Sequence, residues 1–165
     1  MPETYDRIIA TTLGSAQTDV TLSSIPATYT DLVLIINAGS SAGADANFRL
    51  NGDSGSNYSR TFLTGNGSAA SSNRTANALV GRLNANAYPF GGAGNTTIVA
   101  QFMNYSNTVT NKTVIARANQ ASLGTDLVVS LWRNTAAINS ILILSTSAAT
   151  FAAGSTFTLY GIKAA

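Results

Sequence analysis

Alternation of apolar and polar residues with period two runs through most of this chain, and no segment has a helical period of useful length. The last third shows the pattern best, over residues 127–132, 138–146 and 155–163. Successive side chains of a strand point to opposite faces, so the pattern predicts strands. The short segments 135–137 and 152–154 predict tight connections between neighbouring antiparallel strands.

Similar short segments occupy the earlier part of the chain, at 18–25, 29–37, 47–50, 58–63, 79–83, 96–105 and 111–118. Residues 64–78 have no periodicity and predict a long loop. Many short strands without helices predict an all-β fold, an antiparallel two-sheet sandwich of about eight to ten strands. The strand count and the long early loops favour a jelly-roll-like arrangement.

The chain of 165 residues is expected to form one domain, over residues 16–165. Residues 1–15 are less regular and leave two alternatives open. They form either a first edge strand or an arm that docks on another subunit, because termini are mobile unless they are tied down.

The residues needed for common catalytic chemistry are missing. The chain has no histidine and no cysteine, so the usual base of a hydrolytic triad is absent, as are thiolate metal sites. Most of its seven carboxylates lie at strand ends or in turns, where they cap backbone N–H groups. The loop 51–57 has oxygen side chains at alternate positions but one carboxylate, which favours a turn over a calcium site. We therefore expect no enzymatic activity, no metal and no cofactor.

Charge and hydropathy exclude further classes. The net charge is +2, too small to indicate a nucleic-acid binder, and no stretch approaches the ~20 apolar residues of a membrane span. Charged residues are 10% of the chain, against ~25% in an average domain. Such a surface, rich in Ser, Thr and Asn, is common on proteins held in large assemblies. The first residues do not resemble a signal peptide, so synthesis in a cytoplasm is expected.

Candidate partner-binding residues lie in the N-terminal segment, in an arginine-rich third and in a loop near residue 90. They are Tyr5, Arg7, Ile8, Arg49, Arg60, Arg74, Tyr88 and Phe90. The arginines, with Arg82, form either a basic stripe that contacts an acidic protein surface or a solvated face. Among the aromatic residues, Trp132 is expected in the core or between subunits, whereas Tyr58, Tyr88 and Tyr105 are better candidates for exposure.

Several passages resemble small virion structural proteins of tailed bacteriophages. They are TYDRIIATTLGSA at 4–16, SSIPATYTDL at 23–32, FRLNGDSGSNY at 48–58 and FAAGSTFTLYGIK at 151–163. The resemblance implies a virion component and carries no catalytic motif.

Two roles in the particle follow from that resemblance. One is a capsid decoration (cement) protein, expected as a homotrimer that clamps the major capsid protein on the surface of the head. The alternative is a tail-fibre or spike component that binds a host glycan through loops such as 64–78. That loop has no aromatic residue, which favours decoration.

Overall fold

A computed structural model describes residues 4–40, 43, 45–85, 96–146 and 149–163, and these residues form strands and turns without any helix. The strands are β1 (Tyr5–Thr12), β2 (Asp19–Leu22), β3 (Asp31–Ala38), β4 (Ala46–Leu50), β5 (Tyr58–Gly65), β6 (Ala70–Ala78), β7 (Gly81–Arg82), β8 (Thr96–Met103), β9 (Lys112–Gln120), β10 (Gly124–Trp132), β11 (Ile141–Ser145) and β12 (Thr156–Ile162). The all-β prediction is confirmed.

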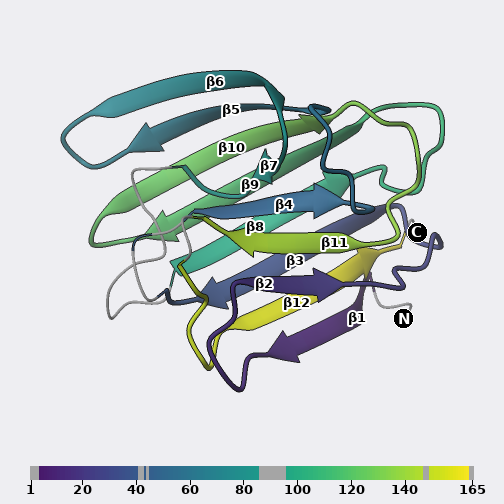
Figure 1. Ribbon diagram of the computed structural model, residues 1–165, viewed down its shortest axis with the longest axis horizontal. Coiled ribbons are helices and arrows are strands. Elements are labelled where there is room, and N and C mark those ends of the chain that lie inside the picture. Colours follow the sequence, from purple (N-terminus) through teal and green to yellow (C-terminus); the bar gives the residue numbers. More distant parts are fainter. Residues whose placement is uncertain (1–3, 41–42, 44, 86–95, 147–148, 164–165) are drawn as a thin grey trace.

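The strands form two antiparallel sheets packed as a sandwich (Figure 1). The larger sheet has the order β1-β12-β3-β8-β9-β10-β5-β6, and the smaller has the order β2-β11-β4-β7. If β5, β6, β9 and β10 are set aside, the chain changes sheet at each step between the remaining strands except from β4 to β7, which pair in the smaller sheet. Eight strands of that order, β1-β12-β3-β8 facing β2-β11-β4-β7, make a jelly roll, as predicted.

The four other strands widen the larger sheet. The hairpin β9–β10 and the hairpin β5–β6 add to the free side of β8, so that β6 is one edge of the sheet and β1 the other (Figure 1). Two predictions were wrong here. Residues 64–78 are the second half of a hairpin, not a loop, and the segments 135–137 and 152–154 connect strands of opposite sheets.

The core fills the space between the sheets. Phe48 of the smaller sheet packs edge-to-face on Phe102 and Tyr58 of the larger one, with ring centroids 5.7 and 6.1 Å apart. Tyr58 in turn stacks on Trp132 at 6.4 Å. All four side chains are buried, and aromatic pairs of this kind add to the stability from apolar burial. Trp132 is therefore a core residue, and the expected exposure of Tyr58 was wrong.

The N-terminal segment contributes an edge strand to the larger sheet. β1 pairs along its length with β12, with a register shift between Arg7 and Ile9. β12 itself lies between β1 and β3, so the end of the described chain is inside the sheet rather than at its edge. An additional docking role for residues 1–15 stays a prediction.

Candidate functional site: the outer face of the larger sheet

The outer face of the larger sheet, which the smaller sheet does not cover, is the most unusual surface of the molecule. In β10 the residues on this face are Thr125, Leu127, Val129 and Leu131. The inner face carries Val128 and Trp132 together with the polar residues Asp126 and Ser130. Leu127 and Val129 are 41% and 39% exposed. A strand of a sandwich ordinarily turns its apolar side inward. Here the more apolar stripe faces outward.

The register that exposes this stripe is held by polar groups on the inner face of β10. Asp126 accepts hydrogen bonds from the Thr64 hydroxyl at 2.6 Å and from the backbone N–H of Ala85 at 2.8 Å. Ser130 Oγ exchanges hydrogen bonds with the backbone N–H and C=O of Arg82 in β7, at 3.1 and 3.3 Å. A shift by one residue would bury the apolar stripe but would break all these bonds, so the polar groups fix which face is exposed.

The third inner anchor of β10 is Trp132, whose indole N–H donates to Asp53 Oδ2 at 2.7 Å. Asp53 also accepts from the Asn57 side chain at 2.9 Å and from the Gly55 N–H at 2.8 Å. Burial acts to raise the pKa of Asp53, but these donors hold it below its usual value. The loop 51–57 is thus a turn, and its carboxylate, Asp53, fixes the orientation of the buried Trp132 side chain. Among the described residues no group of three or more metal-ligating side chains is placed to hold a metal ion.

The strands that widen the larger sheet, β5, β6, β9 and β10, cover a cluster of buried charged side chains on their inner side. Arg82 forms an ion pair with Asp45, and the two side chains are 11% and 10% exposed. Burial raises the pKa of Asp45 and that of Asp126, while Arg82 opposes both shifts. Burial, with the neighbouring Arg82, lowers the pKa of Arg60, which lies on the inner face of β5. The two alternatives for these arginines, a basic stripe or a solvated face, are both wrong, because Arg60 and Arg82 turn into the sandwich.

Three of the predicted partner-binding residues lie on the outer face. Tyr5 and Arg7 in β1 pair with Ile162 and Tyr160, and both are exposed. The Tyr5 ring stands edge-on to the Tyr160 ring, with centroids 6.3 Å apart. Exposed Arg74 pairs with Thr61 at the opposite end of the sheet, also on this face. The structure thus places them on one surface, although they are far apart in sequence.

The remaining predicted residues lie elsewhere. Ile8 is half-buried against the core, and Arg49 is on the outer side of the smaller sheet, where its Nε donates to the Leu79 carbonyl at 3.4 Å. Tyr88 and Phe90 lie outside the described residues. Tyr105, expected to be exposed, is buried in the core.

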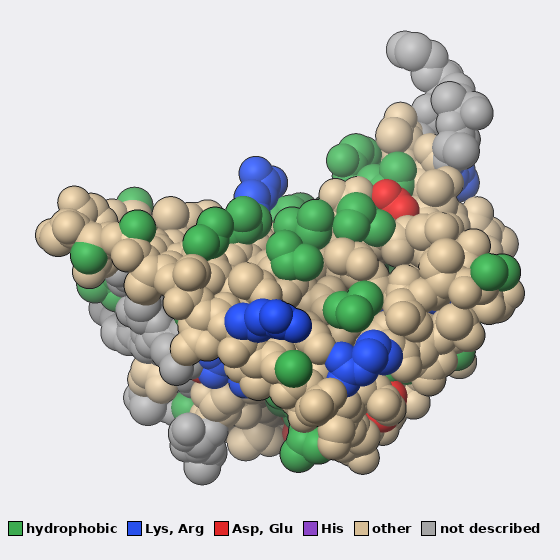
Figure 2. All heavy atoms as spheres, turned by 90° about the horizontal axis from the view of Figure 1, so that it is seen from above, with side chains coloured by type: hydrophobic (Ala, Val, Ile, Leu, Met, Phe, Trp, Pro, Cys, Tyr) green, Lys and Arg blue, Asp and Glu red, His purple; other side chains and the backbone are tan. Residues whose placement is uncertain are grey.

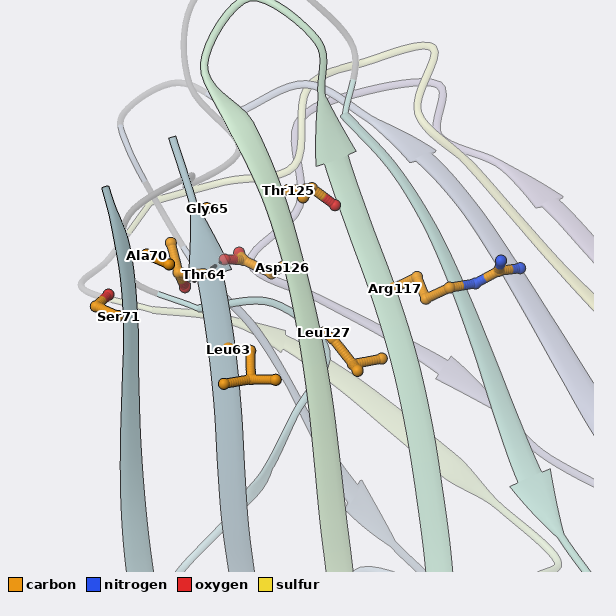
Figure 3. Close-up of a pocket in the computed structure, with 9 residues that line it drawn as sticks. All are labelled: Leu63, Thr64, Gly65, Ala70, Ser71, Arg117, Thr125, Asp126 and Leu127. Atoms are coloured by element: carbon orange, nitrogen blue, oxygen red, sulfur yellow. Dashed lines mark hydrogen bonds between the residues drawn. The ribbon is translucent and has the colours of Figure 1, made fainter. Parts of the chain in front are cut away.

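Four residues of the outer face were not predicted from the sequence to belong to a binding site. They are Leu63, Arg117, Leu127 and Val129. Leu63 and Leu127 are cross-strand partners, so their side chains are neighbours on one face. Figure 3 shows Leu63, Leu127 and Arg117 projecting to the same side of the sheet, and Asp126 to the other. Alternation alone had placed Leu127 and Val129 together, but it could not tell outside from inside.

Comparison with known proteins adds no relative. No protein-family model matches the sequence, and none of the curated proteins matches it. No helix long and apolar enough to cross a membrane occurs in the described part of the chain.

Proposed function

We propose that this protein is a non-enzymatic structural component of a bacteriophage virion, a decoration protein on the surface of the capsid. The observation that carries the proposal is the outward apolar stripe of β10, fixed by buried polar groups beneath it. Contiguous exposed apolar surface on a soluble protein is typical of a site that another protein covers. The resemblance of several passages to virion structural proteins indicates that this assembly is a bacteriophage particle.

In this role the protein adds interface area between capsid subunits and so resists the pressure of packaged DNA. Stable interfaces of permanent assemblies commonly bury more than ~2,000 Å². A broad sheet of eight strands offers a surface of suitable breadth. The partner is the major capsid protein, and the decoration protein itself is expected to be a homotrimer.

The structural roles of three aspartates support a function without catalysis. Asp45, Asp53 and Asp126 are engaged in hydrogen bonds or an ion pair that hold the sandwich together. An acid–base pair for hydrolysis would need carboxylates facing a cleft that substrate can enter. Asp45 and Asp126 are instead buried.

The alternative, a tail component that reads a glycan, has less support. Such sites present aromatic planes, but Tyr58, Tyr105 and Trp132 are all buried. Among the described aromatic residues of the outer face, Tyr5 is 57% exposed and Tyr160 beside it is partly buried, so Tyr5 is the better placed of the two for stacking on a sugar. Binding of the purified protein to host envelope polysaccharide would favour this alternative.

Quantification of the protein in purified virions tests the proposal. Decoration requires hundreds of copies per particle, so its gel band should be comparable in molar amount to that of the major capsid protein. A band at trace level would exclude decoration. Separation of heads from tails before electrophoresis distinguishes the two virion roles, because a decoration protein stays with the heads.

A further inference from the structure

We propose that the outer face of the larger sheet contains a docking groove for an apolar and acidic segment of a partner protein, in which a carboxylate of the partner binds Arg117. This inference deepens the proposed function and rests on it, since the partner is taken to be a subunit of the particle. The groove consists of two hollows that share Arg117.

The first hollow, of about 420 Å³, lies over the end of the β5–β6 hairpin. Leu63 and Leu127 form one wall, Ala70 and Thr125 lie opposite, and Gly65 leaves the space between them open. The glycine is not required by the backbone, because its φ lies outside the left-handed region, and a Cβ there would meet no atom within 4 Å. Neither the backbone conformation nor the neighbouring atoms require a glycine at position 65, and the lack of a side chain there keeps the hollow open.

The second hollow, of about 210 Å³, continues from Arg117 toward the other edge of the sheet. Its lining includes Tyr5, Val33, Val99 and Ile115, from four different strands. The two hollows are neighbours on this face, because Arg117 lines both. Figure 2 shows the upper outline of the molecule curving inward, with hydrophobic side chains gathered along it.

The charges of this face define the partner. Among the described residues, the outward side chains of its strands include Arg7, Arg74 and Arg117, and one carboxylate, Asp31. Asp126 also lines the first hollow, but it belongs to the inner face and accepts hydrogen bonds from Thr64 and Ala85. The oxygens of Asp31 already accept from the Gln101 side chain at 2.9 Å and from the Asn104 N–H at 2.7 Å. The Arg117 side chain is exposed, and its guanidinium makes no hydrogen bond or ion pair with another described residue. A guanidinium set among apolar side chains selects a carboxylate with apolar neighbours.

A second copy in face-to-face contact fits this groove poorly. Two-fold packing of the same face would set two surfaces of the same positive sign against each other, and like charges brought together in an interface repel. An acidic segment of another protein supplies the missing charge. Its apolar side chains would fill the hollow over Gly65 and extend toward Tyr5.

The test uses purified protein and particles assembled without it. Gly65→Val fills the first hollow with a residue suited to strands, and Arg117→Ala removes the cation. Each should weaken binding to the particles about tenfold or more, because a hydrogen-bonded charge or a filled pocket contributes at least ~1.4 kcal/mol. Arg117→Lys should restore part of the loss.

Two matched controls accompany these variants. Thr21→Val places a valine on the exposed side of β2 in the opposite sheet, and Asp19→Asn removes a charge from the same strand. Both should bind like the wild type. Equal melting temperatures for Gly65→Val and the wild type establish that the fold is intact.

Each result has a distinct meaning. Loss of binding by Gly65→Val and Arg117→Ala, with both controls unaffected, supports the groove. If the wild type binds and these two variants bind equally well, the groove is overturned while decoration stands. If the wild type itself does not bind, the proposed function fails. If Gly65→Val lowers the mass of the free oligomer in light scattering, the occupant is a second copy and the acidic partner is wrong.

Discussion

The buried ion pair between Asp45 and Arg82 offers a quantitative test of how the widened sheet is held to the smaller one. Replacing Asp45 by Asn keeps the size of the side chain and removes its charge. Arg82 then remains in a site where its side chain is 11% exposed, and its Nε has no partner. Removing one member of a buried pair costs about 3–5 kcal/mol, because the other charge stays desolvated and unpaired.

The lower end of that range is expected, near 3 kcal/mol, because Asp126 also acts on Arg82. Urea unfolding at pH 7 measures the loss as a shift in midpoint at constant slope. The double variant Asp45→Asn/Arg82→Met should lose less than the sum of the two single variants, by at least ~1 kcal/mol, because no charge is left unpaired within the pair.

An exposed carboxylate provides the control for this experiment. Asp19→Asn, in edge strand β2, should change the free energy of unfolding by less than about 0.5 kcal/mol. If Asp45→Asn were equally mild, or if the two single changes were additive, the ion pair would not hold the sheets together and this reasoning would be refuted.

Three further changes test the packing around the strands. Gly161→Ala should destabilise by about 1–3 kcal/mol in urea unfolding, because the new methyl group would overlap the Tyr29 ring; an unchanged midpoint would show that the ring moves aside freely. Trp132→Phe should cost about 1.5–3 kcal/mol in thermal unfolding, as the bond from the indole N–H to the Asp53 carboxylate is lost; a smaller cost would mean that this bond contributes little. Deleting residues 157–165 removes most of β12 and should leave insoluble or unfolded chain by circular dichroism, whereas a soluble folded product would contradict the central place of that strand.

The fold class could be predicted because alternation is a local property. Strands such as β3 and β12 were found close to their true bounds, since apolar residues at every second position leave few other structures. Strand β6 was not predicted because its first residues are all exposed. No buried face requires apolar side chains at alternate positions there. A strand stabilised mainly by pairing with β5 carries no apolar signature.

The order and connections of the strands could not be predicted from the sequence, for a different reason. Short connections at 135–137 and 152–154 suggest hairpins, but in a jelly roll equally short connections cross between sheets. The same limit applies to the site. Val128 and Val129 cannot be told apart in the sequence. The inner-face contacts of Asp126, Ser130 and Trp132, which the sequence does not show, determine that Val129 faces outward.

Locating this chain in an electron cryomicroscopy map of the intact particle tests the central claim most directly. We expect copies on the head, with the outer face of the larger sheet against the shell and with Leu63, Leu127 and Arg117 buried in the contact. Copies whose outer face is turned to solvent would contradict the assignment of this face. A head without the chain would contradict the decoration role itself.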